Sequence, residues 1–418
     1  MPRLEAPGVA PRLTDLRRDL HPQALINGLI AFVFAASGPL AIILSVGSAA
    51  EVSTALIASW VFGCFALNGV LTILMSWRYR MPLVFFWTIP GMVLVGEALV
   101  RMPFAEIVGA YLLSAILMLV LGLSGWIGRI MRTIPLPIVM GMVAGVFLRF
   151  GTDLLRQLQS DLWLAGPMVL VFVALSARPR AARFLPPLLG ALLTGALVIL
   201  LGPAAVQSPA PDANSLAWGA TAVLANPVFT LPQVTWRAAL ELVVPLVITV
   251  LVVQNGQGTA VLRAANHQAP INAIATACGL WSLPAACVGA VSTCLTGPSN
   301  AIVVSSGRPE HHYVGAITVG VLAVLFGLFS PLVTRLLLAT PGAFIVVLGG
   351  LAMLRVLQGA FQSAFRDRFS LGALISFLVT VSGIQIATIG APFWGLVAGY
   401  GLSRILEADD HAATPRMH

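Results

Sequence analysis

Residues 85–96 read FFWTIPGMVLVG, an apolar stretch that the pair Pro90 and Gly91 divides in the middle. The residues around the pair are apolar enough for the interior of a bilayer, but proline and glycine both oppose a continuous helix. Thr88, which precedes the pair, carries the single polar hydroxyl next to it. The stretch therefore predicts an extended segment followed by a half-helix that starts within a membrane. Such an irregular backbone is tolerated there only where it is buried in protein or lines a cavity.

The whole chain has the composition of an integral membrane protein. Of its 418 residues, 58% are hydrophobic and 9% are charged, whereas soluble domains carry about 25% charged residues. Apolar runs recur from residue 22 to residue 406, and only loops separate them. We therefore expect one all-α polytopic membrane domain. The sequence contains no recognisable metal cluster, nucleophile–base pair or cofactor loop, so we expect neither an enzyme nor a cofactor.

Hydropathy predicts about 14 spans, several of them short or interrupted. They cover residues 22–47, 54–76, 83–99, 104–126, 134–155, 162–177, 184–202, 238–262, 270–285, 288–306, 312–334, 340–358, 369–386 and 390–406.

Arginine placement predicts the orientation of these spans. With the N-terminus inside, 18 arginines fall on the inner side and 5 on the outer side, a bias that follows the positive-inside rule. Topology thus accounts for the net charge of +8 without a nucleic-acid partner. We expect an integral protein of a bacterial inner membrane with both termini in the cytoplasm.

An internal repeat relates the two halves of the chain. The stretch VGAYLLSAILMLVLGLSG from Val108 resembles VGAITVGVLAVLFGLFS from Val314, which lies 206 residues later. The same spacing relates Arg129 to Arg335, Pro135 to Pro341 and Arg149 to Arg355. The repeat unit holds an odd number of spans, so the second copy is inverted in the membrane, an arrangement typical of secondary transporters.

The repeat predicts the domain organisation. We expect a cytoplasmic N-terminal tail over 1–21, a first repeat of seven spans over 22–202 and an extracytoplasmic connector over 203–237. A second inverted repeat over 238–406 and a cytoplasmic tail over 407–418 complete the chain.

The same spacing maps the Pro-Gly break onto Thr296 and Gly297, within GAVSTCLTGPSNAIVVSSG, residues 289–307. Each copy thus has one span, the third or the tenth, that starts extended and ends as a half-helix. A helix N-terminus carries roughly half a positive charge and free N–H groups, so two of them can hold one carboxylate. Alternatively, the Pro and Gly residues only permit close helix packing. The candidate substrate-binding residues here are Phe86, Trp87, Thr88, Pro90, Gly91, Thr293, Thr296, Gly297, Ser299 and Asn300.

A second polar stretch, VVQNGQGTA at 252–260, lies in the predicted eighth span. Amide side chains are costly in hydrocarbon unless they face partners or water. They either bind substrate or form hydrogen bonds between helices. The candidates are Gln254, Asn255 and Gln257, with Ser37 and Gly38 as the counterparts in the first span.

Acidic residues are scarce at mid-membrane depth. Glu241, about one turn into the eighth span, is the candidate proton carrier, and pairing with Arg237 one turn away is the alternative. A proton can also travel on the carboxyl group of the substrate, whose pKa is about 4.

The chain resembles the benzoate:proton symporter family, whose fold is similar to that of uracil and xanthine permeases and of sulfate and bicarbonate carriers. The resemblance extends over roughly residues 20–406 and is carried by WRYRMPLVFFWTIPG (77–91), MVAGVFLRFG (142–151), LVVQNGQGTAVLRAAN (251–266), ISFLVTVSG (375–383) and APFWGLVAG (391–399).

This resemblance implies two inverted sets of seven spans, alternating access and often a homodimer. It implies a core domain of spans 1–4 and 8–11 and a gate domain of spans 5–7 and 12–14. A Gln-Asn motif of the family corresponds to Gln254 and Asn255, and a Thr/Ser-Pro-Gly motif to Thr88, Pro90 and Gly91. The sequence departs from the family pattern at 256–258 and in the tenth span, both within the expected site.

We therefore expect a transporter that imports benzoate or a similar aromatic carboxylate with protons. The alternatives are a channel or uniporter for small anions on the same fold and a symporter for a different organic acid.

Overall fold

A computed structural model describes residue 5 and residues 13–127, 135–201, 223–305, 307–386 and 390–413. Parts of the predicted tails and of the predicted connector over 203–237 lie outside these residues. The described part is mostly helical, and its strands are two segments of three residues each.

The first half of the chain contains one of these strands among its helices. Its elements are α1 (Leu13–Asp19), α2 (Pro22–Ala49), α3 (Thr54–Phe62), a π-helical turn (Gly63–Leu67), α4 (Asn68–Tyr79), β1 (Phe85–Trp87), α5 (Ile89–Leu99), α6 (Phe104–Ser124), α8 (Leu136–Ser160), α9 (Leu162–Ser176), α10 (Pro179–Phe184) and α11 (Pro187–Leu201).

The second half contains the other strand. Its elements are α12 (Trp236–Ala238), a π-helical turn (Ala239–Val243), α13 (Val244–Ile248), a second π-helical turn (Thr249–Gln254), α14 (Asn255–Ala264), α15 (Ile271–Cys287), β2 (Thr293–Leu295), α16 (Gly297–Val303), a 3₁₀ turn (Pro309–His311), α17 (His312–Leu328), α18 (Ser330–Leu338), α19 (Gly342–Phe365), α20 (Ser370–Ser382), α21 (Ala391–Leu406) and α22 (Ala408–Ala413).

The described helices have the length and composition of a membrane protein. Seven helical segments are long and apolar enough to cross a bilayer, and five shorter apolar helices accompany them. Every predicted span contains helical residues, but the number of spans that cross the membrane and their inversion stay predictions.

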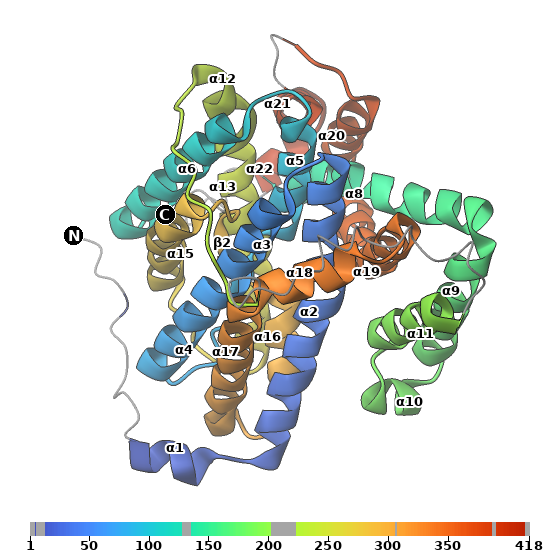
Figure 1. Cartoon of the computed structure of the whole chain (residues 1–418). Coiled ribbons are helices and arrows are strands. Elements are labelled where there is room, and N and C mark those ends of the chain that lie inside the picture. Colours follow the sequence, from blue (N-terminus) through green and yellow to red (C-terminus); the bar gives the residue numbers. More distant parts are fainter. Residues whose placement is uncertain are drawn as a thin grey trace.

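Helix packing divides the described elements into two groups (Figure 1). In the strand-bearing group, which comprises α2–α6 and α12–α17 with both strands, α6 packs against α15 and α17 packs against α2 and α4. In the flanking group, α8–α11 and α19–α21, α8 packs against α19 and α20 and α9 packs against α11. The two groups meet mainly where α19 and α11 contact α2.

Candidate functional site

β1 and β2 pair as antiparallel strands in the interior of the strand-bearing group. Phe86 lies opposite Cys294, and Trp87 lies opposite Thr293. The ladder continues where the Thr88 N–H donates to the carbonyl of Ser292 at 3.0 Å. Both strands are fully buried. Each strand leads directly into a half-helix, α5 or α16. Both predicted spans are therefore interrupted in the structure, as the sequence indicated.

Side chains from neighbouring helices satisfy the outer edges of the two strands. Thr72 Oγ1 accepts from the Phe85 N–H at 2.8 Å. Asn300 Oδ1 accepts from the Val84 N–H at 3.1 Å, and Asn300 Nδ2 donates to the Val84 carbonyl at 3.0 Å. Because edge groups have no water to bond in a membrane, such side chains make this irregular backbone tolerable.

The edge of β2 is bonded in the same way. Asn255 Oδ1 accepts from the Leu295 N–H at 2.8 Å, and the Thr293 N–H donates to Ser282 Oγ at 2.9 Å. The hydroxyl of Thr293 itself donates to Asn68 Oδ1 at 2.8 Å. Among the predicted site residues, Asn255, Thr293 and Asn300 thus support the strand pair.

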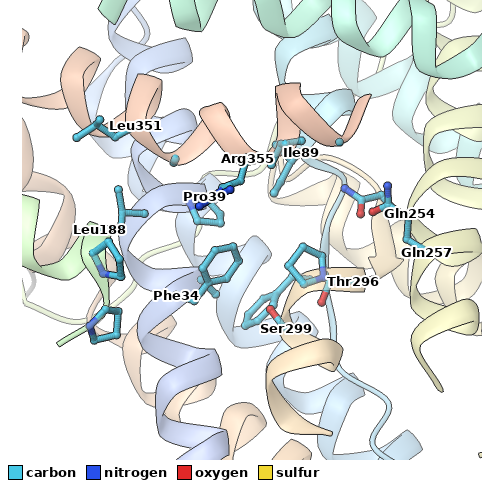
Figure 2. A pocket seen from close by; sticks show the side chains of 18 of the residues that line it. Phe34, Pro39, Ile89, Leu188, Gln254, Gln257, Thr296, Ser299, Leu351 and Arg355 are labelled. Carbon is cyan, nitrogen blue, oxygen red and sulfur yellow. The ribbon is translucent and has the colours of Figure 1, made fainter. Parts of the chain in front are cut away.

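A cavity of about 750 Å³ lies between the strand-bearing group and the flanking group (Figure 2). Its wall is mainly apolar, with a few polar side chains, which is typical of a small-molecule site. Its lining residues are Phe34, Ala35, Pro39, Phe86, Trp87, Ile89, Phe172, Ser176, Ala182, Pro186, Pro187, Leu188, Gln254, Gln257, Thr296, Pro298, Ser299, Leu351, Ala352, Arg355, Val356, Gly359 and Ser363.

Six of the predicted site residues line this cavity. They are Phe86, Trp87, Gln254, Gln257, Thr296 and Ser299. Figure 2 shows Gln254 and Gln257 on one side of the cavity and Thr296 and Ser299 beside them. Gln254 ends a π-helical turn, a helix irregularity that frequently occurs at functional sites.

Two buried polar atoms of cavity-lining residues have no hydrogen-bond partner within the described part of the chain. They are Trp87 Nε1 and Thr296 Oγ1. Thr296 is the N-cap residue of α16, yet its hydroxyl does not cap that helix. An unpaired buried polar group costs about 1–3 kcal/mol. Both atoms have almost no accessible surface, so a ligand or water reaches them only after neighbouring side chains move.

The two half-helices differ at their N-termini. Thr88 Oγ1 accepts from the Gly91 N–H at 3.2 Å and donates to Thr249 Oγ1, also at 3.2 Å. The side chain of Thr88 is therefore occupied as the cap of α5. Neither Thr88, Pro90 nor Gly91 lines the cavity, whereas Ile89 does.

The remaining predicted residues lie beside the cavity. Ser37 Oγ donates to the Phe34 carbonyl at 3.1 Å within α2. A Cβ added at Gly38 would lie 2.4 Å from Leu188 Cδ2 and 2.5 Å from Ala352 Cβ, so this glycine permits close contact with the flanking group. Gly297 packs in the same way against Gln257.

Glu241 also lies outside the cavity. It is buried and forms an ion pair with Arg101, whose Nε donates to Glu241 Oε1 at 3.1 Å. Arg237 Nε lies 3.9 Å from the other carboxylate oxygen. The pairing with Arg237 that the sequence suggested is therefore present, together with a closer arginine that it did not suggest.

Sequence reasoning missed most of the apolar lining residues and also Arg355, the charged residue among the described lining residues. The arginine count places Arg355 among the 18 arginines on the inner side, whereas in the structure it lies in the interior of α19 and lines the cavity. The sequence does contain a signal for it, because an ionisable residue inside an apolar span is by default a candidate for function.

Comparisons with known proteins agree with a transporter fold. The family described as "Benzoate membrane transport protein" matches residues 18–405. The chain is 29% identical to the benzoate membrane transport protein of Acinetobacter baylyi, over 93% of this chain and 96% of that protein. It is also 29% identical to the inner membrane protein YdcO of Escherichia coli, over 91% of this chain and 95% of that protein.

Solved structures of anion transporters share the fold at low sequence identity. The transmembrane domain of the cyanobacterial bicarbonate transporter BicA superposes with a TM-score of 0.60 at 15% identity, over 91% of this chain and 97% of that one. Murine SLC26A9 in the inward-facing state superposes with a TM-score of 0.63 at 12% identity, over 96% of this chain and 71% of that one.

Proposed function

Because the chain belongs to the benzoate membrane transport protein family, we propose that it imports benzoate or a similar aromatic carboxylate with protons by alternating access. The chain is a membrane transporter and not an enzyme. The finer statements below, on substrate, coupling and topology, are part of the proposal.

The observation that carries the proposal is the composition of the cavity wall. The wall combines aromatic and aliphatic side chains, amide and hydroxyl groups and one cation, and its described lining residues include no acid. A benzoate ring fits the apolar part, formed by Phe34, Phe86, Leu188 and Leu351. The carboxylate finds donors in Gln254, Gln257, Thr296 and Trp87, some of which have no other partner.

We place the carboxylate at the start of α16 rather than midway between the two half-helices. Thr88 caps α5 with its own hydroxyl, but no side chain caps the first turn of α16. We assign the Gly297 and Ser299 N–H groups and the Thr296 hydroxyl as donors to the anion; Pro298 between them has no N–H.

The alternating-access part of the proposal assigns the strand-bearing group to the core and the flanking group to the gate. Fourteen spans in two inverted sevens, both termini in the cytoplasm of an inner membrane, and a homodimer belong to the same proposal. The antiparallel pairing of β1 with β2 supports it, because inverted copies are expected to bring their broken spans together in this way.

Among the described residues of the cavity wall, no side chain takes up or releases a proton near neutral pH, because Arg355 stays protonated and the others do not ionise. Glu241 lies elsewhere, in an ion pair. This favours transfer of the proton on the substrate carboxyl group. The same observation supports the second candidate function, a uniporter or channel for small anions.

Uptake into proteoliposomes tests the proposal and separates the two candidates. A panel of radiolabelled aromatic and aliphatic acids is offered with and without an inward proton gradient. A symporter concentrates benzoate above the outside level only when the gradient is present. Equilibration without accumulation supports the uniporter, and no benzoate flux at all contradicts both the substrate and the mechanism.

A further inference from the structure

Arg355 lies in the interior of α19, within the predicted span over 340–358, and its side chain is exposed. It lies eleven residues before Arg366, roughly 16 Å away along the helix axis at 1.5 Å per residue. An arginine within an apolar span is expected to face a water-filled cavity or a partner. Arg355 does line the cavity between the two helix groups, and Figure 2 shows it there with Pro39 and Phe34.

This arginine has no acidic partner among the described residues. Its Nη1 donates to Gln358 Oε1 at 3.1 Å, a neutral neighbour on the same helix. Some of the other described arginines are paired with acids, such as Arg80 with Asp19 at 2.7 Å and Arg149 with Asp153 at 3.5 Å. Arg355 differs from the remaining described arginines because it lines this cavity. The positive charge of Arg355 is thus left for a group that enters the cavity.

Comparison with Arg149 sharpens this difference. Arg149 and Arg355 are separated by the repeat spacing of 206 residues and lie in α8 and α19, which pack against each other. Arg149 finds its acid, Asp153, four residues later on its own helix. The corresponding position after Arg355 is Gly359, which also lines the cavity and has open space where a side chain would begin.

We propose that Arg355 is the cation by which the flanking group attracts and holds the carboxylate of the substrate. This assignment rests on the proposed function and deepens it. Arg355 faces the cavity from α19, while Gln254, Gln257 and Thr296 face it from the strand-bearing group. In this assignment the carboxylate binds Arg355 while the rest of the ligand lies toward the strand-bearing group, and an uncharged analogue of the same shape loses the interaction with the Arg355 charge.

Binding of benzoate and of benzamide to the purified full-length protein, measured by calorimetry, tests the assignment. Arg355→Gln is expected to weaken benzoate binding by roughly 10- to 100-fold, the range of a hydrogen bond to a charged group. Benzamide binding changes little, so the preference for benzoate falls. Arg355→Lys keeps the charge and retains most of the preference.

Two further variants use the comparison with Arg149. Gly359→Asp places an acid where Asp153 stands relative to Arg149 and should reproduce the loss seen with Arg355→Gln. Gly359→Asn has nearly the same shape without the charge and should weaken benzoate much less. Arg149→Gln is the matched control and should bind benzoate like the unaltered protein, because Arg149 lies outside the cavity.

The outcomes separate the assignment from the function on which it rests. If Arg355→Gln remains folded and keeps both its benzoate affinity and its preference over benzamide, Arg355 is not the anion-binding cation. If the unaltered protein binds no benzoate, the proposed function fails and the assignment fails with it. Equal losses in Gly359→Asp and Gly359→Asn would also contradict the assignment, because shape alone would explain them.

Discussion

At the scale of single residues, two neighbouring amides have different surroundings. Gln254 lines the cavity, and its side-chain amide has no hydrogen-bond partner within the described part of the chain. The next residue, Asn255, accepts from the Leu295 N–H at 2.8 Å and donates to Cys278 Sγ at 3.6 Å. Successive residues of a helix point about 100° apart, so one amide faces the cavity and the other faces β2. Both side chains are amides, so the sequence did not show that one faces the cavity and the other supports β2.

Alanine substitutions are expected to separate these two roles. Asn255→Ala leaves the buried Leu295 N–H without a partner, so it should destabilise the protein by about 1–3 kcal/mol. Gln254→Ala should weaken benzoate binding with little change in stability. Thermal unfolding in detergent and ligand titration on both variants check this. The opposite pattern, with binding lost only at Asn255, would reverse the assignment.

At the scale of elements, the two half-helices are similar in sequence pattern but not in capping. Both begin with a threonine and have a proline in the first turn. Thr88 caps α5 and bonds to Thr249, whereas the Thr296 hydroxyl is left without a partner in the described part of the chain. We therefore regard α5 as a support of the site and α16 as the element that presents donors to the substrate.

Substitutions of the two threonines should have unlike effects. Thr88→Ala removes an N-cap and should lower stability by about 1 kcal/mol, while Thr88→Ser retains the hydroxyl and the cap. Thr296→Val leaves no orphaned hydroxyl, so it should preserve stability and weaken benzoate binding. Melting temperatures and titrations of the three variants provide the measurement. A strong loss of stability in Thr296→Val would assign a structural role to that hydroxyl.

At the scale of the whole molecule, the cavity is bounded by the contact of α2 with α11 and α19. Gly38 allows this contact, since an added Cβ would lie 2.4 Å from Leu188 Cδ2 and 2.5 Å from Ala352 Cβ. The Leu188 side chain can rotate away, but the Cβ of Ala352 is attached to the backbone and cannot. The distance between the two helix groups is therefore sensitive to a single methyl group at this point.

Gly38→Ala is expected to force the groups apart and to slow transport. Overpacking of this kind costs about 1–3 kcal/mol, which opposes the arrangement described here. Initial uptake rates in proteoliposomes should fall by roughly tenfold, in line with a change of about 1.4 kcal/mol. Gly401→Ala is a matched control, because a Cβ there meets nothing within 4 Å. Equal rates in the two variants would show that the contact at Gly38 does not limit transport.

The sequence by itself determined the class of the protein and the places where its helices break. Composition and hydropathy predict a helical membrane protein, because a chain in the bilayer must satisfy its backbone N–H and C=O groups internally and an α-helix does so within one segment. The Pro-Gly pair acts on its immediate neighbours and the repeat spacing maps it onto the second half, so the starts of α5 and α16 were predictable from a few residues. The aromatic and amide residues of the cavity could be proposed for the same reason.

Only the tertiary structure decided which polar side chains face the cavity and which support the strands. Asn300 bonds to Val84 across 216 residues, and Thr293 bonds to Asn68 across 225. Such partners depend on how helices rotate and pack, which no local pattern specifies. Helix packing also decided that Arg355 lines the cavity. The count of arginines in loops assigns an arginine to one side of the membrane but does not place it in a cavity. Packing between distant helices therefore set the chemistry of the site, while local sequence set its framework.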